Sequence, residues 1–337
     1  MSSRKRWAIG VAGAALGACA LAGLWSSGCG LQHVQLDSTG LVPLSAENAP
    51  VRVNEDGTST ITVATGVTGS TCTFPYDPLM WRVARFPIIE SSDGIPVLLD
   101  TGHAPAARVT IDTAREAALP VHLEENINFA YAPQIRIGPL VVSDLLAMVD
   151  LRQWQFRVLG IPLYRMRGWT LGSPVLLTQT RYLAFDNPAR QVTFGFENFE
   201  PSHEAHWRQY DLTLDSSARR PFVRVPIAGI ELELLLDSAG GPRLILNPEQ
   251  WEQIASSAVV LSRRRTSYPA WGGFQEVDEY AVKSLDIAGL GSTNSRVWVR
   301  RAPILDNAPP LLGLGPLAKA IVVFDVAGGK FWLGTPR

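Results

Sequence analysis

The sequence predicts a mainly β protein that contains two duplicated β-barrel lobes with short helices and a cleft between the lobes. The first observation is a pair of aliphatic runs, 97–102 and 234–239, in which an aspartate is followed by a small hydroxyl residue. The second is a series of short apolar runs separated by turn signals, which is typical of β domains. An ionised carboxylate at the end of a buried strand is costly unless a partner offsets it. We therefore expect Asp100 and Asp237, which lie 137 residues apart, to meet.

Composition allows a large core and gives no sign of a nucleic-acid partner. The chain has 337 residues, of which 46% are hydrophobic and 18% charged, and its net charge is −1. Such a chain can bury one large core or two ordinary ones. The one dense basic run, Arg263-Arg264-Arg265, is expected to be a solvated loop. The closest histidine pair, His203 and His206, has no third ligand beside it, so we expect no metal site. We expect no cofactor either.

Residues 1–29 are predicted to be an export signal and lipoprotein leader. The basic stretch Arg4-Lys5-Arg6 precedes an apolar run at 7–25, and small residues with a cysteine follow. Two cysteines resemble lipid-attachment sites. Cys19 follows a Leu-Gly-Ala sequence, whereas Cys29 follows Ser-Ser-Gly and comes after the whole apolar run.

Plain secretion and an uncleaved anchor are the alternatives, since an apolar run of about 19 residues nearly suffices to span a bilayer. Lipidation at Cys19 would leave Cys29 and Cys72 free to pair in an oxidising compartment, and lipidation at Cys29 would leave Cys72 alone. Every alternative places the body outside the cytoplasm. We expect an exported protein of the cell envelope, periplasmic or on the outer surface, held at the membrane by a lipid or an anchor.

Two changes in composition divide the remaining chain. Residues 30–78 are rich in Ser, Thr, Gly and Pro and predict a tether with little regular structure, apart from a β-like stretch at 59–67. Residues 79–200 predict an N-terminal lobe and residues 201–337 a C-terminal lobe. The boundary lies in the polar stretch that begins near Glu200.

Each lobe is expected to begin with a hairpin that brings its aspartate to the end of the second strand. Strands at 81–89 and 95–99 flank the Asp93-Gly94 turn, and strands at 222–227 and 231–236 flank a tighter turn. A helix follows in each lobe, at 113–119 and at 247–254, the second with a proline in its first position. The other expected strands are 134–137, 140–142, 182–186 and 192–196 in the first lobe and 282–287, 296–299, 322–325 and 331–334 in the second.

Equivalent landmarks recur at a nearly constant spacing. Pro87 and Pro226 are 139 residues apart, whereas the aspartates are 137 apart because the first hairpin is two residues longer. Each half also contains an aliphatic segment that closes with a glycine, at 171–172 and at 311–313. A repeat of this size, built from short strands, indicates a duplicated β domain.

These motifs resemble the pepsin and retropepsin superfamily, and bacterial retropepsin-like domains in particular. The resemblance covers about residues 81–335 and depends on two Asp-Thr-Gly-like copies, each followed by its closing segment. It implies two acid-protease-like lobes, an active cleft between them and a catalytic dyad of Asp100 and Asp237. The implied protein is an envelope-exposed aspartic endopeptidase with a peptide or protein substrate. Because both halves lie in one chain, no dimer is required for the site.

The chemistry of such a dyad explains its residue types. Two carboxyl groups within hydrogen-bonding distance share one proton, because ionising both is costly, and together they polarise a water molecule. The resemblance implies that the hydroxyls of Thr101 and Ser238 brace the two strand ends. It also implies that the amides of Gly102 and Ala239 hold the carboxylates.

A candidate flap lies in the second lobe, at an aromatic and glycine-rich hairpin that contains Tyr268, Trp271, Gly272 and Gly273. Such a tip could fold over a bound peptide, and an ordinary hairpin with packed aromatic side chains is the alternative. His103, directly after the first motif, is either protonated beside the dyad or an exposed turn histidine that points away.

Departures from the motif leave two other hypotheses open. Ala239 replaces a glycine and carries a Cβ that limits close approach, and the downstream hydroxyl is missing in both lobes. The first alternative is a catalytically silent protein that binds a peptide or an envelope partner in the same cleft. The second is an unrelated β-sandwich in which both aspartates cap turns and their carboxylates lie far apart.

Overall fold

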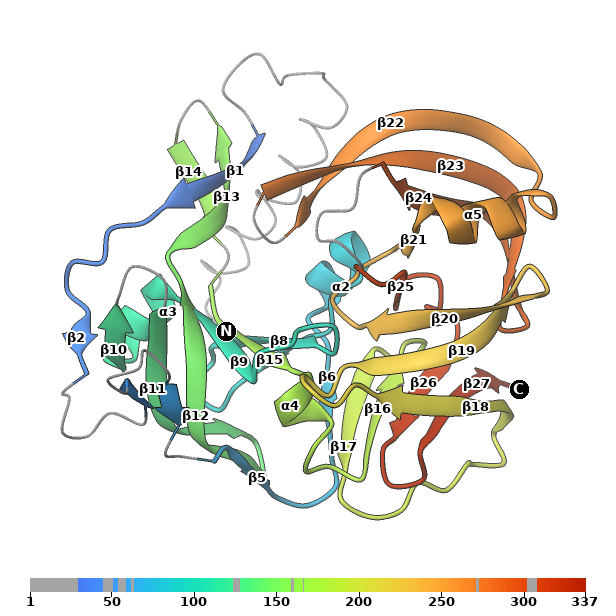
Figure 1. Cartoon of the computed structure of the whole chain (residues 1–337). Helices are drawn as coiled ribbons and strands as arrows, with labels where there is room; N and C mark the ends of the chain where they lie inside the picture. Colours follow the sequence, from blue (N-terminus) through green and yellow to red (C-terminus); the bar gives the residue numbers. More distant parts are fainter. Residues whose placement is uncertain are drawn as a thin grey trace.

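Strands dominate the structure, as the sequence predicted (Figure 1). This computed structural model describes residues 30–44, 51–53, 59–61, 64–123, 128–158, 161–165, 167–270, 273–301 and 308–337. The predicted leader, with Cys19 and Cys29, lies outside these residues. Among the helices in the described ranges, none has the length and apolar character needed to cross a membrane.

The elements that precede residue 200 are mostly short strands. They are β1 (Gly30–Gln35), β2 (Val42–Pro43), β3 (Val51–Val53), β4 (Ser59–Ile61), β5 (Gly66–Thr68), β6 (Cys72–Pro75), α2 (Pro78–Ala84), β7 (Ile88–Glu90), β8 (Pro96–Asp100), β9 (Ala107–Thr110), α3 (Ile111–Glu116), β10 (Pro120–Leu123), β11 (Asn128–Ile137), β12 (Leu140–Asp150), β13 (Arg152–Val158), β14 (Ile161–Arg165), β15 (Trp169–Gly172), α4 (Ser173–Leu176), β16 (Tyr182–Asp186) and β17 (Gln191–Gly195).

In the described part of the second half the strands are longer, and one helix is present. Its elements are β18 (Ala205–Leu214), β19 (Pro221–Ile227), β20 (Ile230–Asp237), β21 (Leu244–Leu246), α5 (Pro248–Ala255), β22 (Val260–Ala270), β23 (Gly273–Ile287), β24 (Leu290–Arg300), β25 (Leu311–Gly313), β26 (Ile321–Asp325) and β27 (Lys330–Pro336).

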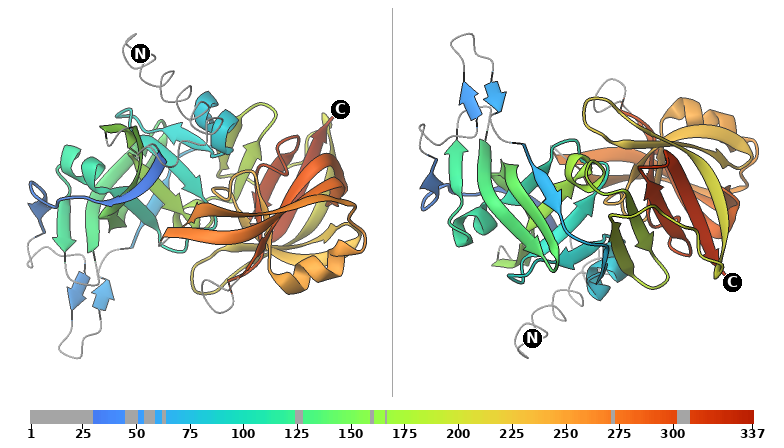
Figure 2. Two further views of the ribbon diagram at one scale, coloured as in Figure 1. Left: turned by 90° about the horizontal axis from the view of Figure 1, so that it is seen from above. Right: turned by 90° about the horizontal axis from the view of Figure 1, so that it is seen from below.

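Two large sheets carry most of these strands, and β1-β13-β14 and β3-β4 form two small sheets. The first large sheet has the order β2-β10-β11-β12-β9-β15-β8-β7, with β5 also paired to β12. The second has the order β22-β23-β24-β21-β25-β20-β19-β18-β27-β26-β16-β17-β6. The views in Figure 2 show the green strands of the first sheet and the yellow-to-red strands of the second as two neighbouring groups.

The same pairing pattern surrounds each aspartate. Strand β8 pairs in parallel with β15, which places Asp100 opposite Gly172, and β20 pairs in parallel with β25, which places Asp237 opposite Gly313. In both halves the glycine-ending strand then pairs antiparallel with a short strand, β9 or β21. That short strand pairs in parallel with a long one, β12 or β24. The two aspartates therefore lie at matching places in their sheets.

Strands from before residue 200 also take part in the second sheet. Strand β16 pairs with β26, so that Leu183 lies opposite Phe324 and Phe185 opposite Val322. The rings of Phe185 and Phe324 are buried, with their centroids 5.9 Å apart. Burial of a Phe side chain contributes about 1.5–3 kcal/mol, so these two rings together contribute roughly 3–6 kcal/mol. This apolar layer holds the two halves together beneath the dyad strands.

The predicted tether has more regular structure than expected. Its described parts form β1 to β6, and four of these strands pair with β13, β10, β12 and β17. The prediction of little regular structure is therefore wrong for these parts. An exposed sheet edge offers unpaired N–H and C=O groups to any extended segment, whatever the composition of that segment.

The strand predicted at 81–89 is wrong in its first half, which forms helix α2. Asp77 caps this helix by accepting a hydrogen bond from the Met80 amide at 2.7 Å, and Pro78 occupies its first turn. Arg85 ends the helix in the left-handed conformation, at φ 59°. Trp81 is buried against Tyr76. Trp81 is the buried residue of this helix, whereas Val83 is exposed, so the alternation that suggested a strand does not correspond to one buried face.

The other predicted helices and strands lie close to observed ones. The basic run Arg263-Arg264-Arg265, expected in a solvated loop, is exposed but lies on strand β22, so that part of the prediction is wrong. The hairpin of β7 and β8 brings Ile89 opposite Val97, and that of β19 and β20 brings Val225 opposite Leu232. Helix α5 begins after Asn247, whose backbone amide donates to Gln250 Oε1 at 3.2 Å. Local turn and cap residues decide these positions, which explains why they were predictable.

Candidate functional site

The structure brings Asp100 and Asp237 together at the ends of β8 and β20. Their carboxyl groups are hydrogen-bonded to each other. The two strand ends also approach closely, because a Cβ added to Gly102 would lie 2.6 Å from Asp237 Cγ. This geometry contradicts the hypothesis in which the two carboxylates lie far apart.

A reciprocal set of hydrogen bonds joins the two strand ends. Thr101 Oγ1 donates to the Leu236 carbonyl at 2.8 Å and accepts from the Ser238 amide at 3.0 Å. Ser238 Oγ donates to the Leu99 carbonyl at 2.6 Å and accepts from the Thr101 amide at 2.9 Å. Both hydroxyls are buried. Each hydroxyl therefore satisfies one amide and one carbonyl of the opposite strand end, which fixes the spacing of the carboxyl groups.

Each aspartate is also held by the turn that follows it. The Gly102 amide donates to Asp100 Oδ1 at 3.1 Å, and the Ala239 amide donates to Asp237 Oδ1 at 2.9 Å. The next amide of each turn, from His103 or Gly240, donates to the backbone carbonyl of its aspartate, at 3.1 Å and 2.9 Å, and lowers the pKa of the nearby carboxyl group. The predicted residues Thr101, Gly102, Ser238 and Ala239 all lie within this arrangement.

The two closing glycines lie where a side chain has no room. A Cβ on Gly172 would lie 2.0 Å from the Pro105 carbonyl oxygen, and a Cβ on Gly313 would lie 2.5 Å from that of Gly241. The backbone after each aspartate therefore crosses directly over a glycine. The hydroxyl of Ser173, next to the first closing glycine, donates to the Thr101 carbonyl.

Burial raises the pKa of both aspartates above the usual range for a carboxyl group. For Asp237 the rise is large, and the charge of Asp100 adds to it. For Asp100 the hydrogen bond from Asp237 and the charge of Arg108 oppose the rise. The pair therefore retains one shared proton to a higher pH than an isolated aspartate.

Sequence reasoning missed two arginines beside the dyad. Arg108, on β9, interacts with the charges of Asp100 and Asp150, and its Nη1 lies 4.0 Å from Asp150 Oδ2. Arg243, which follows the second motif, interacts with the charge of Asp237. An arginine on a strand next to a motif is a weak signal in the sequence, because only the fold decides which way its side chain turns.

His103 fits neither of the two predicted alternatives. Its ring is largely buried, and burial together with the charge of Arg108 lowers its pKa to about 3. The imidazole is therefore neutral at ordinary pH, and it is not exposed in the manner of a surface turn.

The residues of the candidate flap are only partly described. Tyr268 lies on β22 and is buried, with its ring 5.1 Å from the Trp298 ring and its hydroxyl donating to Gln275 Oε1 at 3.0 Å. Gly273 begins β23 opposite Ala270, and Trp271 and Gly272 lie outside the described residues. For Tyr268 the packing matches the alternative of an ordinary hairpin with packed aromatic side chains.

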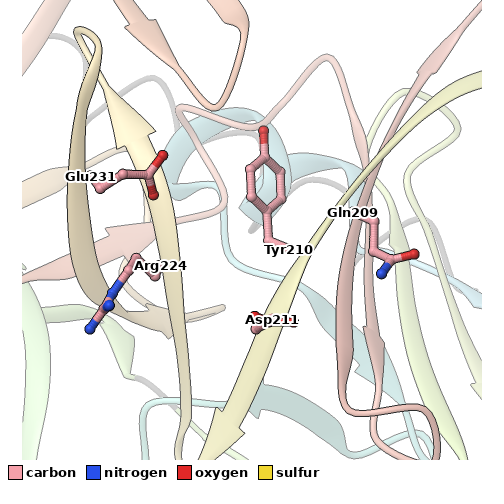
Figure 3. A pocket seen from close by; sticks show the side chains of 5 residues that line it. All are labelled: Gln209, Tyr210, Asp211, Arg224 and Glu231. Atoms are coloured by element: carbon pink, nitrogen blue, oxygen red, sulfur yellow. The ribbon is translucent and has the colours of Figure 1, made fainter.

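The hollow in Figure 3 lies on strands β18 to β20, apart from the dyad. It has a volume of about 280 Å³ and is lined by Gln209, Tyr210, Asp211, Arg224 and Glu231. Asp211 accepts a hydrogen bond from Lys330 Nζ at 2.8 Å, and Arg224 lies 3.5 Å from Glu233. Its charges are thus largely satisfied by neighbours. In the described part of the chain, no group of three or more His, Cys, Asp or Glu side chains could hold a metal ion.

No protein-family model matches the chain, and no curated protein matches it in sequence. The character of the site therefore depends on its geometry alone: two hydrogen-bonded carboxyl groups on matching strand ends, braced by two reciprocal hydroxyls.

Proposed function

We propose that this chain is an aspartic endopeptidase of the pepsin and retropepsin superfamily, with two acid-protease-like lobes and a catalytic dyad of Asp100 and Asp237. The observation that carries the proposal is the hydrogen bond between the two carboxyl groups, which come from matching positions in two similarly paired halves. The reciprocal bonds of Thr101 and Ser238 support it, because they hold both carboxyl groups in a fixed relation without a second chain.

The dyad shares one proton, so one carboxyl group is protonated while the other is ionised and accepts a proton from the attacking water. The water oxygen bonds to the peptide carbonyl carbon while the protonated member donates its proton to the carbonyl oxygen. Collapse of the tetrahedral intermediate breaks the C–N bond, and the amine leaves with a proton from the dyad. The reaction requires one proton on the pair, so activity falls as pH rises through the upper pKa of the dyad.

Replacement of either aspartate tests the proposal. Asp100→Asn and Asp237→Asn in the full chain should each lower cleavage of a peptide library by roughly 1,000-fold or more, because the two groups act as a unit. Asp211→Asn is the matched control, since Asp211 is an exposed carboxylate in the hollow of Figure 3. Unchanged circular dichroism would show that the variants fold. Full activity in either dyad variant would contradict the proposal.

A catalytically silent binder remains the second candidate, favoured by Ala239 in place of a glycine. Ala239 is not among the described residues with a positive φ, so its backbone conformation suits an alanine and its Cβ occupies space beside the dyad. In this case the wild-type chain would bind an extended peptide or a pepstatin-type inhibitor but leave every library peptide intact. We propose for either function that the body is exported to the cell envelope and lipid-anchored through Cys29 or Cys19, on the sequence of the leader alone.

A further inference from the structure

We propose that Arg243 is a specificity residue that binds an acidic side chain of the substrate beside the dyad, on the side of the C-terminal lobe. This inference depends on the proposed peptidase function. It names the class of peptide that the site selects: one with Asp or Glu at a fixed position close to the scissile bond.

Arg243 is held next to the second motif by its own backbone. Its carbonyl accepts a hydrogen bond from the amide of the closing glycine, Gly313, at 2.8 Å. A Cβ added to Gly241 would lie 3.6 Å from Arg243 Nη1, so the guanidinium turns back over the loop that follows Asp237. The charge of Arg243 interacts with that of Asp237. The guanidinium therefore lies in the immediate surroundings of the dyad.

Two aromatic rings fix the orientation of this guanidinium. Its central carbon lies 4.4 Å from the centroid of the Trp298 ring and 5.3 Å from that of the Tyr268 ring. Trp298 is itself anchored, because its Nε1 donates to Glu279 Oε2 at 2.9 Å. Ile245 and Leu311 pack against the same rings. Stacking of this kind leaves the edge of a guanidinium free to donate in a fixed plane.

The donors of Arg243 are not used up by the protein. Its Nε is buried and has no hydrogen-bond acceptor among the residues that the structure describes. The charge of Glu279 also acts on Arg243, but the oxygens of Glu279 already accept hydrogen bonds from Arg264 at 2.8 Å and from Trp298. A buried donor without an acceptor is costly, and a carboxylate that arrives with a substrate would remove that cost through charge-assisted hydrogen bonds.

The corresponding place in the first half has no such donor. Ala106 is the counterpart of Arg243, because its carbonyl accepts from the other closing glycine, Gly172, at 2.9 Å. The arginine beside the dyad in that half is Arg108, and its Nη1 lies 4.0 Å from the carboxylate of Asp150. The preference for an acidic side chain should therefore apply to one side of the scissile bond only.

Cleavage of matched peptides by the full chain tests the inference. A peptide library should show Asp or Glu enriched at one position beside the cleaved bond. For the best sequence, Arg243→Met should lower the ratio of kcat/KM between the acidic peptide and its Gln or Asn analogue by about 10- to 100-fold, since a charge-assisted pair is lost. Arg108→Met is the control, because it removes another guanidinium close to the dyad; it should move the pH profile but keep the acidic preference.

Three results would overturn the inference: no acidic enrichment, an unchanged ratio in Arg243→Met, or an equal loss of preference in Arg108→Met. Binding of a non-cleavable acidic peptide and its neutral analogue, measured by titration calorimetry, separates the two proposals. In one outcome the wild-type chain cleaves no peptide but binds the acidic peptide about 10-fold or more tightly than the neutral analogue, and Arg243→Met abolishes this difference. This outcome would contradict the peptidase function and support the acidic-side-chain site at Arg243. Equal binding of both peptides by the wild-type chain would refute the site.

Discussion

The two turns after the dyad aspartates make the same hydrogen bonds but tolerate different residues. Thr101 and Ser238 bond reciprocally, and one amide of each turn donates to its own aspartate. Gly102, however, leaves no room for a methyl group, because a Cβ would lie 2.6 Å from Asp237 Cγ, whereas Ala239 already carries one. The pairing of the strand ends is symmetric, and the packing around the carboxyl groups is not.

The surroundings of the two aspartates differ in a second way. Asp100 has a buried neutral histidine and an arginine with its own carboxylate partner nearby, while Asp237 has an arginine stacked on aromatic rings. Burial raises the pKa of both aspartates, so the pair holds a shared proton. The side chains around them, and not their nearly identical backbone contacts, distinguish the two carboxyl groups.

Apart from the dyad itself, the largest effect is expected when the third residue of the first motif, Gly102, is changed, and the equivalent change at Ala239 is expected to have little effect. Gly102→Ala should lower cleavage by about 100-fold or more, because the added methyl group must displace the Asp237 carboxyl group. It should also cost roughly 1–3 kcal/mol of stability through overpacking. Ala239→Gly should keep cleavage within a few-fold and cost at most about 1 kcal/mol through the unfolded state. Measurements of kcat/KM and urea denaturation check both variants. A larger loss of kcat/KM or stability in Ala239→Gly than in Gly102→Ala would contradict the proposed difference in packing between the two turns.

A smaller effect is expected from the two reciprocal hydroxyls. Thr101→Val leaves the Ser238 amide and the Leu236 carbonyl without a partner, and Ser238→Ala does the same to the Thr101 amide and the Leu99 carbonyl. Each variant should lose roughly 2–4 kcal/mol of unfolding free energy in urea denaturation.

The exchange variants Thr101→Ser and Ser238→Thr are the controls for this pair. Both keep a hydroxyl, so they should recover most of the lost stability. Clearly unequal losses in Thr101→Val and Ser238→Ala would show that the two halves of the hydrogen-bond set are not equivalent.

The smallest effect concerns the pH dependence of stability. The pKa of Asp237 is raised in the folded state, so the folded chain binds more protons than the unfolded one above the ordinary carboxyl range. This contribution is fully present below the unfolded pKa and is lost as pH rises through the folded pKa. Asp237→Asn removes the charged form, so its Tm should exceed that of the wild type by a few degrees at pH 7 and converge with it in acid.

Asp211→Asn provides a control of opposite sign. The hydrogen bond from Lys330 lowers the pKa of Asp211, so its contribution is present above the unfolded pKa and is lost as pH falls. It should be small, because the carboxylate is exposed. A Tm for Asp237→Asn below that of the wild type at pH 7 would show that burial of the charged dyad is fully offset by its hydrogen bonds.

The predictable parts of this protein are those that depend on residues close together in the chain. Asp93-Gly94 and the alternation on both sides specify the β7–β8 hairpin, and Asn247 with Pro248 specifies the start of α5. The repeat of an aspartate at the end of an aliphatic strand likewise predicted two matching strand ends. Local periodicity and turn chemistry carry this information, and they act within a few residues.

Only the tertiary structure decided how the two strand ends interact and what surrounds them. The hydrogen bond between Asp100 and Asp237 joins residues that are far apart in sequence, and the raised pKa values of both come from burial that no local pattern records. The stacking of Arg243 on Tyr268 and Trp298 brings three separate elements together. The sequence by itself determined that two carboxylates end two similar strands. Closure of the sheets decided that they share a proton, because only then are they buried within hydrogen-bonding distance.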